Sequence, residues 1–397
     1  MLHGSISRRR RNIAVAAGAL TLLVAGTPFL PDRSERTPTA TPASEVEPAL
    51  SGATGPGVIT PEMQAEIERV VAEGARTTVD VRASAYDLAA ASTRCAVFDG
   101  QRYCLGLGWT QKTQAEAAAG LATAAGPTTP TRTTPEQTGD LDPMTSIRQR
   151  AELAPKARAK AERAELTAAA RSVAKVWLIR HEIQGVPLPD NFYELHPEAA
   201  VSARLKPRKH PRKFRILSEK QVRPQQEYYW CGPSTVQMIA WGWRDRRQGQ
   251  ALWADRLHTT TAGTGITEMV RVVNHNTGYD NSDRAGPYVV LDISDFTYEQ
   301  WWRLMKKHIH TYKAPVVLHP VLLKQYFPYL DDDASGHFQV GRGYHRTRDG
   351  QKLLGYFEPW DQSRFDPTEP RIARTQWQSA YKSFRANQAH FQHNVGV

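Results

Sequence analysis

The hydrophobic pattern is clearest in the C-terminal part of the chain, from about Phe214 to Val397. Val236, Ile239 and Trp243 recur at helical spacing after a turn-like polar stretch. Pro233 suits a first helical turn, where its missing amide donor costs nothing. The pattern therefore predicts a helix that begins at Cys231.

A second pattern, GHFQVGRGYH followed by KLLGYFEPW, alternates as strands do and turns at Asp349-Gly350. If Arg346 pairs with Gln351, then Glu358 pairs with Gln339. Glu358 would lie on the same face as His337 and diagonal to it, within roughly 7 to 8 Å between backbones. Asp361 falls on the other face, and a slip of one residue would exchange the two acids.

Nearer the N-terminus, TRCAVFDGQRYC places two short apolar runs around the turn-forming pair Asp99-Gly100. This pattern predicts a hairpin with Cys95 opposite Cys104. In an oxidising compartment the two thiols would form a disulfide.

The remaining pattern divides the chain into regions with different composition. Residues 8 to 11 are arginines before an uncharged run and small residues, which is typical of an export signal. The expected regions are a signal peptide (1–26), a disordered spacer (27–57), a small region with the Cys95-Cys104 hairpin (58–125), a linker (126–143), a helical region (144–203) and a catalytic domain (204–397). We expect the part before residue 204 to be separable and a candidate inhibitor of the rest.

Composition narrows the class of protein. The 397 residues are 40% hydrophobic and carry a formal net charge of +11, which falls to +7 without the four arginines of the signal. These values exclude a fibre and a multi-span membrane protein, and they do not indicate nucleic-acid binding. Seven basic residues among prolines between Arg204 and Arg215 favour a solvated linker.

Candidate chemistry begins with the odd cysteine. If Cys95 and Cys104 pair, Cys231 is a leftover thiol in an exported protein, at the positive end of a predicted helix that would stabilise a thiolate. The side-chain amide of Gln225, six residues upstream, and the backbone N–H of Cys231 could hold a developing oxyanion. His337 is the best-placed imidazole to act as base, with Glu358 to fix its tautomer.

Five stretches resemble, in their order along the chain, the papain-like cysteine peptidases. They are QQEYYWCGPSTVQMI, GTGITEMVRVVNHNTGY, TYEQWWRLMKKHIH, GHFQVGRGYH and YFEPW. The nearest branch is similar to the bacterial bacteriocin-processing peptidases for double-glycine leaders, in a stand-alone secreted form. The resemblance covers roughly residues 215 to 365. It implies an α+β fold in which a helix with the nucleophile packs on an antiparallel sheet.

Carried over by position, the resemblance makes Cys231 the nucleophile, His337 the base and acid, Gln225 the oxyanion donor and Glu358 the orienting residue. The family normally has Asp, not Glu, before the proline that is here Pro359. No ABC-transporter domain or nucleotide-binding motif accompanies the peptidase-like residues, so processing coupled to export is not indicated.

The expected function is therefore a secreted thiol protease, a hydrolase that cuts a peptide or isopeptide bond through an acyl-enzyme. Two alternatives remain: a non-catalytic papain-like binding module at the cell surface, and a transglutaminase-like acyl transferase. The expected partner is a peptide or protein substrate, for which the cell wall is one candidate location. No nucleic-acid partner is expected, and no stable insertion into a membrane is expected after signal cleavage. No cofactor or metal is expected, and His390 and His393 are expected on a surface helix.

Overall fold

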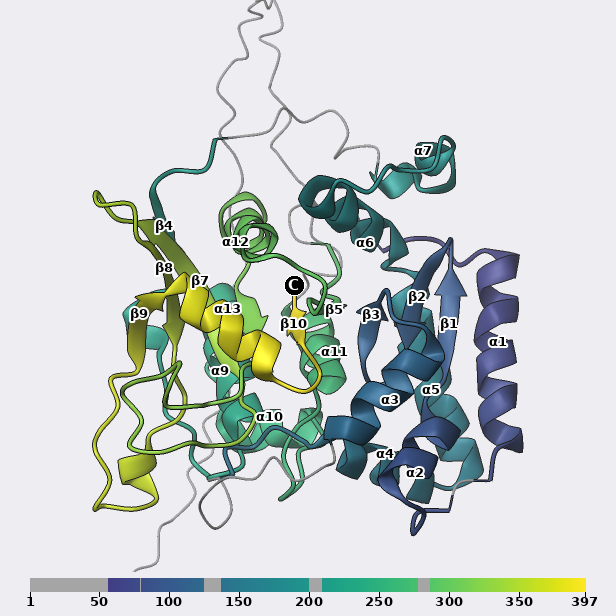
Figure 1. Ribbon diagram of the computed structural model, residues 1–397, viewed down its shortest axis with the longest axis horizontal. Helices are drawn as coiled ribbons and strands as arrows, with labels where there is room; N and C mark the ends of the chain where they lie inside the picture. The colour runs from purple at the N-terminus through teal and green to yellow at the C-terminus, as the bar shows by residue number, and fades with distance from the viewer. Residues whose placement is uncertain (1–55, 79, 125–136, 200–208, 278–285) are drawn as a thin grey trace, which may run out of the picture. The chain divides into compact units, whose positions relative to one another are not determined.

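The computed structural model describes residues 56–78, 80–124, 137–199, 209–277 and 286–397, all within one compact unit (Figure 1). The expected signal peptide and nearly all of the first spacer lie outside these residues. Among the described helices, none is both long and apolar enough to cross a membrane.

The first part of the described chain is a small hairpin surrounded by helices. Helix α1 starts at Pro61, where the side chain of Thr60 accepts a hydrogen bond from the backbone N–H of Met63. The elements are α1 (Pro61–Arg76), α2 (Ala85–Ser92), β1 (Cys95–Phe98), β2 (Gln101–Cys104), β3 (Gly108–Thr110), α3 (Gln114–Ala124), α4 (Pro143–Glu152), α5 (Pro155–Ala170), α6 (Val173–Ile179) and α7 (Phe192–Leu195).

The predicted disulfide is confirmed. Strands β1 and β2 are antiparallel with Cys95 opposite Cys104, and the two residues are joined. Asp99 and Gly100 both have positive φ, 45° and 76°, as a two-residue turn of the primed type requires. The turn chemistry and the cysteine spacing thus specify the same hairpin.

The second part supplies most of the sheet. Its elements are β4 (Lys213–Arg215), α9 (Cys231–Arg244), α10 (Gln250–Arg256), α11 (Ile266–Thr277), β5 (Val290–Asp292), α12 (Tyr298–Lys306), β6 (Val316–Leu318), β7 (Gln339–Arg346), β8 (Lys352–Phe357), β9 (Thr375–Ser379), α13 (Ala380–Ala389) and β10 (Asn394–Gly396). The end of the basic stretch is not a solvated linker, because Lys213 to Arg215 pair with β7.

The strands form a sheet in the order β1-β2-β3-β5-β10-β6-β7-β8-β9, with β4 also paired to β7. All pairs are antiparallel except β3 with β5, which meet in parallel at Trp109 and Leu291. The expectation of helices with an antiparallel sheet therefore holds, except at this one parallel pair.

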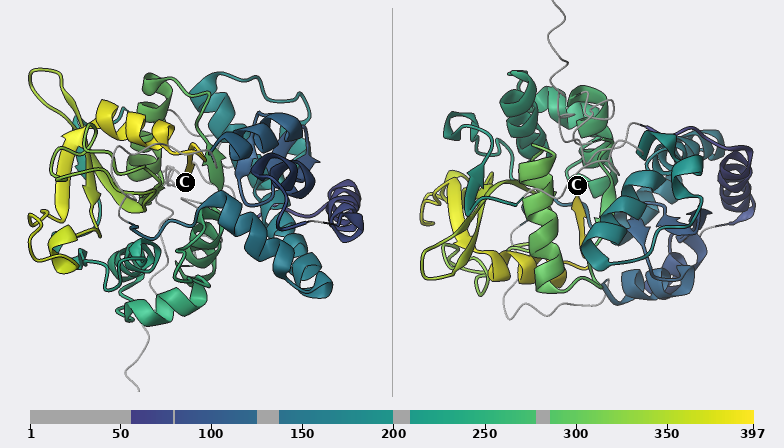
Figure 2. Two further views of the ribbon diagram at one scale, coloured as in Figure 1. Left: turned by 60° about the horizontal axis from the view of Figure 1, so that its bottom comes forward. Right: turned by 90° about the horizontal axis from the view of Figure 1, so that it is seen from above.

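Helices cover both faces of the central strands, because successive residues of a strand point to opposite sides. Val317, Val340 and Phe357 pack with the apolar side of α9 and α11. Leu318, Leu354 and Tyr356 lie in the core that includes α12 and α13. The left view of Figure 2 shows the two helix layers on opposite sides of the strands. Helix α9, which begins at Cys231 as predicted, is thereby fixed against β7.

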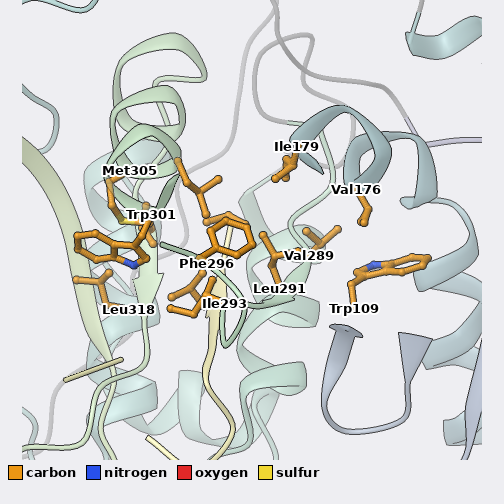
Figure 3. Close-up of a cluster of buried hydrophobic side chains, with 14 of the residues drawn as sticks. Trp109, Val176, Ile179, Val289, Leu291, Ile293, Phe296, Trp301, Met305 and Leu318 are labelled. Atoms are coloured by element: carbon orange, nitrogen blue, oxygen red, sulfur yellow. The ribbon is translucent and has the colours of Figure 1, made fainter. Parts of the chain in front are cut away.

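One hydrophobic core joins the two parts of the chain. It runs from Trp109 on β3 through Leu291 and Phe296 to Trp301 on α12 (Figure 3). Val176 of α6 belongs to the same core. The boundary at residues 203 and 204 stays a prediction, but a shared core does not favour an N-terminal part that detaches intact.

The register of the β7–β8 hairpin corrects the sequence prediction at the turn. Arg346 pairs with Lys352, not Gln351. The register then shifts between Gly341 and Gly343, so that Val340 pairs with Phe357. A bulge adds one residue to one strand. It restores the predicted register just where the strands approach Glu358.

We predict that Trp109→Ala lowers the free energy of unfolding by about 3 to 5 kcal/mol, because the fully buried indole packs edge-to-face on Phe98 and Tyr103. Urea denaturation followed by circular dichroism measures the loss. Tyr86→Ala is the control, since Tyr86 is 65% exposed, and should change stability by less than about 0.5 kcal/mol. A loss below about 1 kcal/mol for Trp109→Ala would contradict the shared core.

Candidate active site

Cys231 lies at the first position of α9, fully buried and in no disulfide. The backbone N–H groups of Gly232 and Phe338 lie near its sulfur and favour the thiolate. A Cβ on Gly232 would lie 2.6 Å from the hydroxyl of Thr264, so only glycine allows this close packing. The thiol therefore lies between the first turn of the helix and the residue after His337.

The pKa of Cys231 is shifted in the direction opposite to the one that the sequence predicts. Burial raises it well above the ordinary value, and the negative charges of Asp140 and Glu358 raise it further. The two backbone N–H groups act in the opposite direction but are outweighed. In this arrangement the thiolate is therefore disfavoured relative to the thiol.

Gln225 and Cys231 direct their donors at one oxygen. The side-chain amide of Gln225 and the backbone N–H of Cys231 lie 3.0 Å and 3.3 Å from the carbonyl oxygen of Thr138. The Gln225 amide also donates to the carbonyls of Glu227 and Tyr228, and its own backbone N–H binds Pro359. The loop thus holds two donors in the arrangement that stabilises an oxyanion.

His337 and Glu358 form a fully buried pair. Nε2 of the imidazole lies 2.7 Å from Oε1 of the carboxylate. Nδ1 has no hydrogen-bond partner among the described residues. With the proton on Nε2 shared with Glu358, Nδ1 presents a lone pair that can accept a proton.

Three further donors hold the carboxylate of Glu358. The hydroxyl of Tyr329 and the amide of Gln339 donate to Oε2 at 2.8 Å and 2.7 Å. The backbone N–H of Trp360 donates to Oε1 at 2.9 Å. A buried carboxylate needs such donors to stay charged. The sequence placed Gln339 opposite Glu358, but no pattern pointed to Tyr329.

Asp361, the alternative acid, lies elsewhere. Its carboxylate pairs with the guanidinium of Arg374 at 2.5 Å and accepts a hydrogen bond from Ser363 at 2.8 Å. No hydrogen bond to His337 is made among the described residues. The geometry therefore brings Glu358, not Asp361, to the imidazole.

The sequence missed a segment that enters the site from the expected linker. The backbone N–H of Thr138 donates to the hydroxyl of Ser335 at 3.0 Å, and the Thr138 hydroxyl donates to the carbonyl of Gly336 at 2.7 Å. Ser335 and Gly336 directly precede His337. Residues 138–141 thus form part of the site and not only a connection.

Asp140, two residues further on, bridges two buried histidines whose rings lie side by side. Its carboxylate oxygens are each 2.8 Å from Nε2 of His319 and of His390. Burial alone would raise the pKa of Asp140, but the two imidazoles hold it well below its usual range. His390 is not on a surface helix as expected, because α13 ends at Ala389 and the ring is fully buried.

These three side chains are a candidate metal set, since their ligand atoms lie within 4.8 Å of one another. Two observations favour hydrogen bonds instead. The 2.8 Å contacts are shorter than the ligand separations of roughly 3.3 Å around a tetrahedral zinc ion with bonds of about 2.0 Å. The backbone N–H of Gln392 also donates to Nδ1 of His390, which leaves the proton of a neutral ring on Nε2, where a metal would bind.

The ring nitrogens of His319 also take part in the hydrogen bonds around Asp140. Asn394 directs its amide nitrogen to the carbonyl of Leu107, so its oxygen faces Nδ1 of His319 at 2.7 Å. Nδ1 of His319 therefore donates to Asn394. Nε2 can face Asp140 favourably only when it carries a proton as well. The cluster is therefore a buried carboxylate that receives hydrogen bonds from two imidazole rings.

Comparison with protein families gives a match to part of the chain. Residues 217–388, a little under half of the chain, match the model of the Peptidase_C39 like family. The matched region contains Gln225, Cys231, His337 and Glu358, but neither Asp140 nor His390. The match supports a C39-like cysteine peptidase in this part of the chain. A search of curated proteins found no match.

We predict that the protein loses stability as the pH falls from about 6.5 to 4. Burial, together with the charge of His319, lowers the pKa of His390 from 6.5 to about 4. The unfolded chain then binds more protons in this window, so the contribution is fully present above pH 6.5 and disappears towards pH 4, by about 3 kcal/mol at most.

The measurement is urea denaturation at a series of pH values. His390→Gln keeps a donor for Asp140 and should flatten the decline between pH 6.5 and 4. His258→Gln is the control, because His258 is 73% exposed, and should keep the parent profile. An unchanged slope in His390→Gln would refute the assignment of a buried neutral ring.

Proposed function

We propose that the protein is a cysteine peptidase that hydrolyses a peptide or isopeptide bond, with Cys231, His337 and Glu358 as the triad and Gln225 as an oxyanion donor. One observation carries the proposal. The Gln225 amide and the Cys231 N–H converge on a single carbonyl oxygen beside the free thiol. The match to the Peptidase_C39 like family supports the same class of activity.

In the proposed reaction, Nδ1 of His337 takes the proton of the Cys231 thiol, and the sulfur attacks the carbonyl carbon of the substrate. The oxyanion is held by Gln225 and the Cys231 N–H. The C–N bond then breaks, the amine leaves with the proton from His337, and a thioester remains. Water, deprotonated by His337, hydrolyses the thioester and frees the enzyme. Throughout, Glu358 orients the ring and stabilises the imidazolium.

We further propose that the enzyme is exported and acts on peptides or proteins outside the cell or at its surface. The arginine-rich start of the sequence and the Cys95–Cys104 disulfide support an oxidising compartment. The stand-alone relationship to bacteriocin-processing peptidases is part of this proposal and rests on the sequence motifs.

The function predicts a ranking of substitutions in a form of the protein whose Cys231 is accessible to an alkylating reagent, measured as cleavage of a synthetic peptide mixture by mass spectrometry. Cys231→Ala and His337→Ala should abolish turnover, and Gln225→Ala should lower the rate by about 10² to 10³. Glu358→Gln should reduce the rate less than His337→Ala, because the ring remains but is poorly oriented.

Asp361→Asn is the matched control for Glu358→Gln, because both replace a buried carboxylate and only Glu358 contacts His337. It should keep nearly the parent rate. If Asp361→Asn is inactive while Glu358→Gln is not, the assignment of the acid is wrong. If amine-containing acceptors are joined to the peptide instead of water, the enzyme is an acyl transferase. If Cys231 reacts with an alkylating reagent and yet no sample turns over any peptide, the protein is a binding module.

A further inference from the structure

The carbonyl of Thr138 occupies the place of a substrate carbonyl. It accepts hydrogen bonds from both the Gln225 amide and the Cys231 N–H. These donors are the ones that the proposed reaction needs for the oxyanion, so a substrate cannot use them at the same time. Cys231 and His337 are both 0% exposed with the segment in place.

The backbone around Thr138 is bound on two sides, as an extended peptide would be. On one side Thr138 binds Ser335 and Gly336, next to His337. On the other side the backbone N–H of Thr264 donates to the carbonyl of Gly139 at 2.8 Å, and the N–H of Leu141 donates to the carbonyl of Thr264 at 2.9 Å. This strand-like pairing recognises main chain and leaves side chains to set specificity.

Gly139 fits because it has no side chain. Its φ is +111°, and an added Cβ would lie 2.3 Å from the carbonyl carbon and oxygen of Tyr229. Residues with a Cβ avoid this conformation and cannot approach a backbone so closely. The segment therefore passes the nucleophile loop only with glycine at this position.

Asp140 anchors the segment beyond the glycine. Asp140 is 6% exposed, and its carboxylate receives hydrogen bonds from His319 and His390, whose rings lie side by side. A buried carboxylate with two imidazole partners resists withdrawal, because leaving would separate the charges and expose unpaired polar groups within the protein.

From these contacts we infer that residues 138–141 bind in the site as an intramolecular peptide ligand and block it. The inference rests on the proposed function, since it takes the two donors as the oxyanion donors of a peptidase. In this form the enzyme is latent. Peptides reach Cys231 only after Thr138 and Asp140 have left their positions.

The test measures alkylation of Cys231 by iodoacetamide in the full chain, located by peptide mapping. Gly139→Ala should displace the segment and raise the alkylation rate at least 10-fold over the parent. Gly249→Ala is the matched control: it adds the same methyl group where no atom lies within 4 Å, and it should react like the parent. Circular dichroism checks that both variants are folded.

A second pair of variants tests the anchor without adding volume. Asp140→Asn removes the charge and turns an amide N–H toward one imidazole donor, so Cys231 should again react at least 10-fold faster. Asp142→Asn is its control, because Asp142 is exposed and caps α4, and asparagine caps a helix equally well. Parent-like alkylation in both folded Gly139→Ala and Asp140→Asn would overturn the inference.

Failure of the inference can be told from failure of the proposed function. Alkylation requires only an accessible thiol, whereas peptide cleavage also requires His337 and Glu358. Faster alkylation of Gly139→Ala without cleavage would support the blocking segment and contradict the peptidase. Rapid alkylation of Cys231 and rapid peptide cleavage by the parent would contradict the blocking segment and support the peptidase.

Self-cleavage is a further outcome to measure. A fragment that begins at Gly139 in the parent but not in Cys231→Ala would also overturn the inference, since the segment would then be a substrate.

Discussion

The buried carboxylate of Glu358 is the constraint on which the arrangement of the site depends. A charge that is removed from water costs several kcal/mol unless donors replace the water. Glu358 is 0% exposed and is satisfied by His337, Tyr329, Gln339 and the backbone of Trp360. Strand β7, the end of β8 and the loop with Tyr329 must therefore meet at one point for the protein to fold.

The same constraint explains how glutamate can stand where the resembling family has aspartate. The longer side chain has to reach the imidazole without disturbing the neighbouring strands. The register shift between Gly341 and Gly343 brings the end of β8 to the height of His337. A Cβ on Gly343 would lie 3.0 Å from both the carbonyl of Phe214 and the ring of Trp377, so a larger residue would have to displace its neighbours on this crowded side of the bulge.

Local sequence patterns predicted the parts of the site that neighbouring residues build. The helix start at Cys231 and the hairpin that brings His337 to Glu358 are short-range features, and the ordered motifs supplied Gln225. Asp140 was missed because its partners His319 and His390 lie 179 and 250 residues away. The bulge was missed because one extra residue in a strand changes no periodic pattern outside the strand itself. The prediction of a lowered pKa for Cys231 was wrong. Burial, which the sequence does not reveal, raises this pKa by more than the helix terminus lowers it.

Asp140 links the state of the segment to the state of the nucleophile. Its carboxylate is held by His319 and His390, and its negative charge raises the pKa of Cys231 beyond the effect of burial. While the segment is bound, the site therefore lacks free oxyanion donors and also disfavours the thiolate. Departure of the segment would remove the charge and admit water, and both changes lower the free energy of the thiolate relative to the thiol. Access to the site and ionisation of Cys231 would then change together, because one carboxylate controls both.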